Sequence, residues 1–99
     1  MSSKWKVKIE KTGETIEARI FKSVVYEGDK EHEFEVTVDK TYSEELFERD
    51  VPLILLVQQS FMFLLEREPV TSILRDFNLR EISRYFPEYE DEMRTLFST

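Results

Sequence analysis

Apolar and polar residues alternate along much of the first 40 residues, and this alternation is typical of strands that bury one face. It runs over 4–10, 15–20 and 32–39, with short turns between these segments. Short connections join antiparallel strands, because a parallel crossover needs roughly a dozen residues. The pattern therefore predicts a three-stranded antiparallel meander. The side chains expected to face inward are Trp5, Val7, Ile9, Ile16, Ala18, Ile20, Phe34, Val36 and Val38.

Turn residues and a change of phase refine this meander. Gly13 is expected to supply the positive φ of a tight hairpin. The alternation loses its phase after Ile20, which predicts a bulge or bend near Lys22 and Ser23. The outward face is expected to carry lysines on the first strand, mixed charge on the second and glutamates on the third. The third strand, 32–39, is an edge strand that could accept a strand from a partner.

The run from 51 to 68 is the richest in large apolar residues and predicts a central helix. Pro52 suits the first turn, where a missing N–H costs nothing. A helix that is apolar nearly all round is covered on more than one side, so this segment is expected at the centre of the fold. At about 100° per residue, its core-facing stripe collects Leu53, Ile54, Val57, Phe61, Leu64 and Leu65.

The two flanks of this helix are apolar as well, and they leave two interpretations open. Leu55 and Met62 lie on one flank, whereas Leu56 and Phe63 lie on the other. Either further helices of the same chain cover them, or a partner does, which includes a second copy of the chain. Aromatic residues near the C-terminus are anchors of the kind that interfaces use. The candidate interface residues are Leu55, Leu56, Met62, Phe63, Tyr85, Phe86 and Tyr89.

Helical spacing is predicted on both sides of the central helix. A capping box at 41–44 predicts a short helix before it. After it, a helix is predicted over 70–77, and a second capping box at 78–81 starts the next helix. Pro87 can begin the last one. These elements cover the other side of the central helix in the predicted fold.

The predicted fold is therefore α+β: an N-terminal three-stranded antiparallel β-meander packed on a central hydrophobic helix, with shorter C-terminal helices. The chain has 99 residues, which is the size of a single domain, with the meander in 1–40 and the helical part in 41–99. A membrane span is not expected, because the apolar run is shorter than the roughly 20 residues that a bilayer needs.

A helix-turn-helix is an alternative interpretation of 69–86. Arg75, Arg80 and Arg84 would then contact nucleic acid. The net charge of −7 argues against this, since such binding depends mainly on Lys and Arg that neutralise phosphates. Nucleic acid is therefore not the expected partner.

Composition removes several kinds of chemistry. The chain has no cysteine, which excludes disulfides and thiolate sites and fits a reducing compartment. His32 is the only histidine, and no catalytic constellation or glycine-rich phosphate loop is present. The absence of an apolar leader makes a cytoplasmic protein the expectation. The sequence thus predicts a small, acidic, non-enzymatic protein–protein interaction domain with no cofactor or metal, whose partner is an unknown protein or a second copy.

Overall fold

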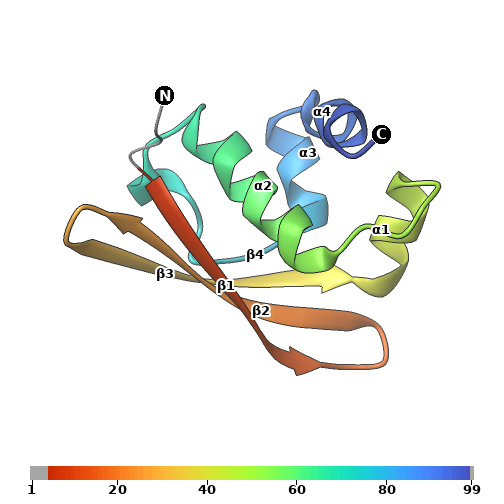
Figure 1. Cartoon of the computed structure of the whole chain (residues 1–99), viewed down its shortest axis with the longest axis horizontal. Coiled ribbons are helices and arrows are strands. Elements are labelled where there is room, and N and C mark those ends of the chain that lie inside the picture. Colours follow the sequence, from red (N-terminus) through yellow and green to blue (C-terminus); the bar gives the residue numbers. More distant parts are fainter. Residues whose placement is uncertain (1–4, 99) are drawn as a thin grey trace.

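The computed structural model describes residues 5–98 as ten elements, shown in Figure 1. Lys4, with which the first predicted strand begins, lies outside the described residues. In chain order the elements are β1 (Trp5–Glu14), β2 (Ala18–Glu27), β3 (Lys30–Asp39), α1 (Lys40–Leu46), α2 (Leu53–Leu65), the 3₁₀ turn η1 (Val70–Ser72), β4 (Asp76–Asn78), the 3₁₀ turn η2 (Leu79–Glu81), α3 (Ile82–Tyr85) and α4 (Tyr89–Leu96).

The fold is α+β, as predicted, but the sheet has four strands in the order β1-β2-β3-β4. The first three strands are antiparallel, whereas β4 pairs parallel to β3. The helix predicted over 70–77 does not form, because part of this segment is extended and pairs with backbone groups at the edge of β3. The Glu35 N–H donates to the Arg75 carbonyl at 2.7 Å, and Phe77 is buried on the sheet. The predicted free edge at 32–39 is therefore partly occupied by the chain itself.

The first hairpin turns later than predicted. β1 continues through Gly13 to Glu14, and the register shift lies between Lys11 and Gly13 rather than in β2. The Thr15 hydroxyl holds the turn, accepting from the Ala18 N–H at 3.0 Å. Ile16 is consequently 93% exposed instead of inward. Among the described residues, Gly28 alone has a positive φ, at 64°.

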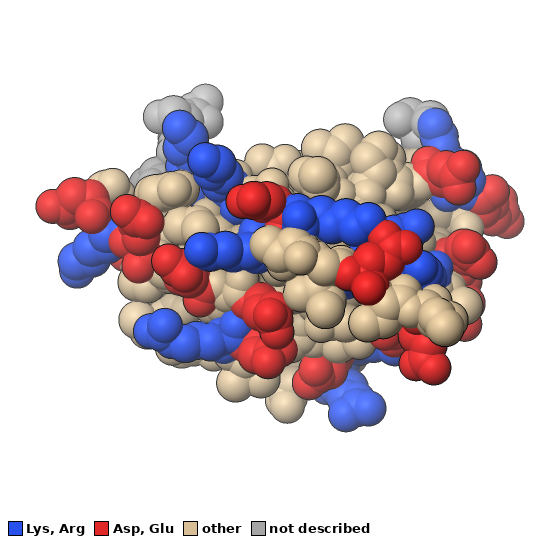
Figure 2. Space-filling view, turned by 90° about the horizontal axis from the view of Figure 1, so that it is seen from below, with Lys and Arg blue, Asp and Glu red and all other residues tan. Residues whose placement is uncertain are grey.

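The helices all lie on one face of the sheet, and the opposite face is seen in Figure 2. Phe21, Ser23 and Val25 of β2 are buried under the helices, so the inward phase of β2 is the reverse of the predicted Ile20 phase. Alternation along β2 places half-buried Val24 and Tyr26 on the face away from the helices, between β1 and β3. The register places Lys8 and Lys6 of β1 on one side and Glu33 and Glu31 of β3 on the other. The lysine and glutamate stripes are thus present, while the middle stripe is more apolar than predicted.

Helix α2 crosses the sheet and forms the centre of the core (Figure 1). Phe61 packs on the sheet with its ring 5.2 Å from Phe34 and 5.9 Å from Phe77. On the side away from the sheet, the Tyr89 hydroxyl of α4 lies 2.6 Å from Ser60 Oγ. The C-terminal helices therefore pack on one flank of α2 only, and the prediction that they cover its whole other side is not met, since Ile54 and Leu55 are exposed. Within residues 5–98, no helix is both long enough and apolar enough to cross a membrane.

Helix ends follow the predicted caps only in part. Asn78 and Glu81 form the predicted capping box, in which the Asn78 side chain accepts from the Arg80 N–H and Glu81 accepts from the Asn78 N–H. The box predicted at 41–44 does not form, since α1 already begins at Lys40. Pro52 precedes α2 as its cap instead of lying within its first turn.

Candidate functional site

The seven candidate interface residues divide into a buried group and a surface group. Leu56, Phe63 and Tyr89 are almost wholly buried within this chain, so they do not form an exposed surface in this fold. The reason is that the C-terminal helices pack on their flank of α2: the Phe63 ring lies 5.2 Å from Tyr89 and 5.8 Å from Phe86. Leu55 and Tyr85 are exposed, whereas Met62 and Phe86 are half-buried.

One line of α2 is exposed at Leu55 and half-buried along the rest of its length, and we call it the α2 ridge: Leu55, Gln58, Gln59 and Met62. Spacings of three, four and seven residues place them along one line of the helix. Leu55 is 44% exposed, and the other three are half-buried. Ile54 is also exposed, contrary to its predicted place in the core stripe, because the sheet-facing side of α2 is centred on Val57 and Phe61.

The α2 ridge contains no charged residue, and neither does the rest of α2. Charged residues make up 35% of the chain, so an uncharged exposed helix line of this length is unusual for this molecule. Exposed apolar surface with few charges is typical of the central part of protein interfaces. The ridge is therefore one candidate site.

A second candidate is a cavity of about 230 Å³ at the C-terminal end of α2, which we call the α2–α3 groove. Buried Leu64, Phe77 and Ile82 form part of its lining, and they come from α2, β4 and α3. At its rim, Leu74 is 57% exposed and Tyr85 is 69% exposed. The full lining is Leu64, Glu68, Ser72, Ile73, Leu74, Phe77, Glu81, Ile82, Tyr85 and Phe86.

Two carboxylates line this groove, and they differ in their partners. Glu81 Oε1 accepts from the Asn78 N–H at 3.0 Å and so completes the capping box of η2. Glu68 is half-buried, and its carboxylate has neither a hydrogen bond nor an ion pair within residues 5–98. Burial raises the pKa of Glu68 above its usual value. A carboxylate that is partly desolvated and unpaired favours a cation beside it.

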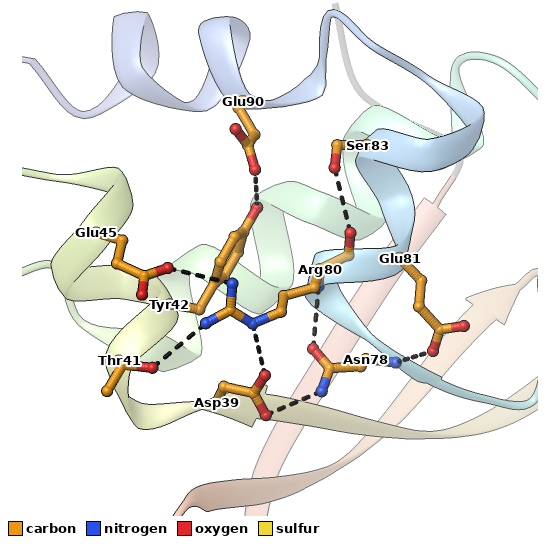
Figure 3. Close-up of polar contacts among 9 residues, drawn as sticks. All are labelled: Asp39, Thr41, Tyr42, Glu45, Asn78, Arg80, Glu81, Ser83 and Glu90. Carbon is orange, nitrogen blue, oxygen red and sulfur yellow. Dashed lines mark hydrogen bonds and ion pairs between the residues drawn. The ribbon is translucent and has the colours of Figure 1, made fainter.

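Arg80, one of the three predicted nucleic-acid contacts, is used inside the fold (Figure 3). Its Nε donates to Asp39 at 2.6 Å, and its other nitrogens reach Glu45 and Thr41 at 3.2 and 3.3 Å. Its guanidinium also stacks over the Tyr42 ring, 4.9 Å from the centroid. This network ties η2 to the end of β3 and to α1, so Arg80 is not displayed on a recognition helix.

The predicted helix-turn-helix is absent as a structure, because 70–78 holds a 3₁₀ turn and a strand. Arg75 and Arg84 are both exposed. Arg75 lies in the segment just before β4, whereas Arg84 lies in α3. No ion pair involves either side chain in the part of the chain that the structure describes. Contact of Arg75 and Arg84 with nucleic acid stays an untested prediction, although the pair of helices on which it was based is absent from the described residues.

Glu68 and Leu74 were missed by sequence reasoning. Glu68 precedes Pro69 at the end of the predicted central helix, and the pattern there indicates only where the helix ends. Leu74 fits the stripe of the helix predicted over 70–77 and was expected to face the core. Neither position carries a local signal for a groove, because the opposite walls come from β4 and α3.

Comparisons of the chain with protein families, curated proteins and solved structures give no match. Among the described residues, no group of three or more His, Asp or Glu side chains is arranged to hold a metal ion. The α2 ridge and the α2–α3 groove are the two surfaces from which a function can be argued.

Proposed function

We propose that the protein is a protein–protein interaction module that self-associates through the α2 ridge. The observation that supports this is the uncharged, partly exposed line of Leu55, Gln58, Gln59 and Met62 on a chain rich in charge. Apolar surface that the fold leaves open gains free energy when a second surface covers it.

The order of residues along the ridge suits a second copy in the antiparallel direction. Leu55 and Met62 lie equally far from the midpoint between Gln58 and Gln59. A two-fold axis through that midpoint therefore sets Leu55 of each copy against Met62 of the other. It also sets glutamine against glutamine, and amides pair well with each other because each both donates and accepts hydrogen bonds. Such self-complementarity is what a two-fold interface requires.

Charge also favours this surface over the rest of the molecule. Each chain carries a net charge of −7, so two copies repel each other at most orientations. The ridge carries no carboxylate that would face its copy. Self-association along α2 thus brings together two helices that carry no charged side chain.

The test is the molecular mass in solution, by light scattering behind a sizing column at several concentrations. Wild-type protein should show twice the mass of one chain, and Leu55→Glu should show the mass of one chain. Circular dichroism should show that Leu55→Glu is still folded. The matched control is Leu96→Glu, because Leu96 is 51% exposed on α4, away from the ridge. It should leave the dimer intact. A strictly monomeric wild type, or a dimer unaffected by Leu55→Glu, would rule out the ridge.

A further inference from the structure

The size of the α2–α3 groove restricts what it can hold. Pockets for drug-sized molecules measure about 300–1,000 Å³, whereas this groove offers about 230 Å³. An apolar cavity of about 150 Å³ is enough to bind benzene. The groove therefore suits one aromatic ring or one branched alkyl side chain, and it is small for a whole cofactor.

The walls of the groove match such a side chain. Its interior presents the apolar side chains of Leu64, Phe77 and Ile82. Leu74 and Tyr85 stand exposed at the rim, from the segment before β4 and from α3. Large apolar side chains at a rim give further contact to the residues that flank an inserted anchor.

Charge indicates what should lie next to the anchor. Glu68 is half-buried in the lining and unpaired within residues 5–98, while the other carboxylate, Glu81, is already held by the Asn78 N–H. A Lys or Arg brought by a ligand would pair with Glu68 and compensate its partial burial. The net charge of −7 also draws a basic partner toward the molecule.

We propose that the α2–α3 groove binds a peptide segment of a partner protein in which one large apolar side chain is followed or preceded by Lys or Arg. The apolar side chain fills the cavity between Leu64, Phe77 and Ile82. The basic side chain pairs with Glu68. This site is separate from the α2 ridge, because Leu64 lies on the opposite side of the helical wheel from Leu55 and Met62, and Glu68 lies beyond the end of α2.

The probe is a phage-displayed library of random peptides, selected on the wild-type protein and counter-selected on Leu74→Glu. The enriched sequences should share an aromatic or branched aliphatic residue with Lys or Arg within two positions of it. Enrichment of sequences that lack a basic residue would overturn the proposal. So would the absence of any sequence that distinguishes the wild type from Leu74→Glu.

One enriched peptide is then synthesised, and its Kd is measured by fluorescence anisotropy. Leu74→Glu should raise the Kd at least about tenfold, since it places a carboxylate against the apolar anchor. Glu68→Gln should raise it about 2–5-fold. A peptide whose basic residue is replaced by alanine should bind the wild type and Glu68→Gln equally, because the coupled pair is then already broken. Equal effects of Glu68→Gln on both peptides would contradict the pairing.

Two controls separate this site from the α2 ridge and from a general effect of added charge. Leu96→Glu adds the same carboxylate to an exposed leucine of α4 and should leave the Kd unchanged. Leu55→Glu should also leave peptide binding unchanged, and Leu74→Glu should leave the mass in solution unchanged. If Leu74→Glu instead lowered the mass of a wild-type dimer, the groove would belong to a second copy and the peptide proposal would be wrong.

Discussion

The two flanks of α2 have nearly the same chemistry and opposite environments. One carries Leu55 and Met62, and the other carries Leu56 and Phe63. Leu56 and Phe63 are buried, whereas Leu55 is exposed and Met62 is half-buried. The difference arises outside the helix, where the C-terminal elements bring the rings of Tyr89 and Phe86 onto the Phe63 flank. Hydrophobicity thus makes a flank suitable for burial, and the placement of other elements decides whether it is buried.

The covered flank is held by polar contacts as well as by packing. Arg67, just after α2, donates to Glu88 at 3.0 Å and also reaches Glu92 of α4, and its guanidinium lies 3.5 Å from the centroid of the Phe63 ring. The Tyr42 hydroxyl of α1 donates to Glu90 of α4 at 2.9 Å, as Figure 3 shows. On the other flank, the ridge is uncharged and the Leu55 side chain is 44% exposed. This contrast is why we propose a second copy there.

The largest difference in stability should appear when one leucine on each flank is truncated to alanine. Leu56→Ala should lower the free energy of unfolding by about 2–5 kcal/mol, because it opens a cavity in a packed core. Leu55→Ala should change it by about 0.5 kcal/mol or less, as is usual at exposed positions. Urea denaturation of dilute protein, in which any dimer has dissociated, measures both values. Similar losses for the two variants would mean that both flanks are buried within one chain.

A smaller effect should come from removing the hydroxyl of Tyr89, which fastens α4 to α2 at Ser60 Oγ. Tyr89→Phe should lower the free energy of unfolding by about 1–2 kcal/mol, because a buried hydrogen bond is lost while the ring stays. Tyr85→Phe is the matched control, since Tyr85 is exposed on α3, and it should have almost no effect. Thermal unfolding of the three proteins side by side gives the comparison. Equal stability of all three would show that packing alone holds the covered flank.

The smallest effect should come from Asp39, which anchors η2, and through it α3, by way of Asn78 and Arg80. The Asn78 amide and then the Arg80 guanidinium lower the pKa of Asp39 below its usual value of 3.8. A carboxyl group with a lowered pKa stabilises the folded state above its unfolded pKa, and this contribution is lost as pH falls through the folded pKa. Asp39→Asn should therefore cost about 1 kcal/mol at neutral pH.

Urea curves of the wild type and Asp39→Asn over a series of pH values test this sign. The difference in stability should be constant near neutrality and should shrink once the pH falls below the usual pKa of an aspartate. Asp29→Asn, at an exposed position between β2 and β3, should show no such convergence because no ion pair involves Asp29 among the described residues. A gap that widens in acid would show that folding raises the pKa of Asp39 and would contradict the expected sign.

Much of the architecture could be predicted from local pattern. Alternation marked β1 and β3, whereas for β2 it marked only the first residues and gave the wrong inward phase. The apolar run marked α2 within two or three residues of its observed ends. The Asn78–Glu81 capping box also forms as predicted, because both of its hydrogen bonds join residues three apart or closer. The strand β4 was missed, since three residues carry almost no periodic signal and the reason for their extension is the distant edge of β3.

The candidate site was less predictable than the fold. The ridge could be seen as one of two equivalent flanks, but the groove could not be seen at all. Its walls come from α2, from β4 and from α3, and Glu68 acquires its partial burial only when these meet. Burial of a polar group depends on the residues around it in space. The residues next to it in the sequence do not predict it.

The sequence by itself determined the alternation of β1 and β3, the Asn78–Glu81 capping box and the fact that α2 is apolar on more than one side, because each of these depends on residues close together in the chain. Only the tertiary structure decided that Leu56 and Phe63 are buried, that Met62 is half-buried against the edge of the core, and that Leu55 is exposed. The physical reason is that α4 begins at Tyr89, more than 20 residues beyond the end of α2, and its side of approach is set by packing and by distant hydrogen bonds such as Tyr89 to Ser60. A helical wheel shows which positions share a face, but it carries no information about which face meets a neighbour.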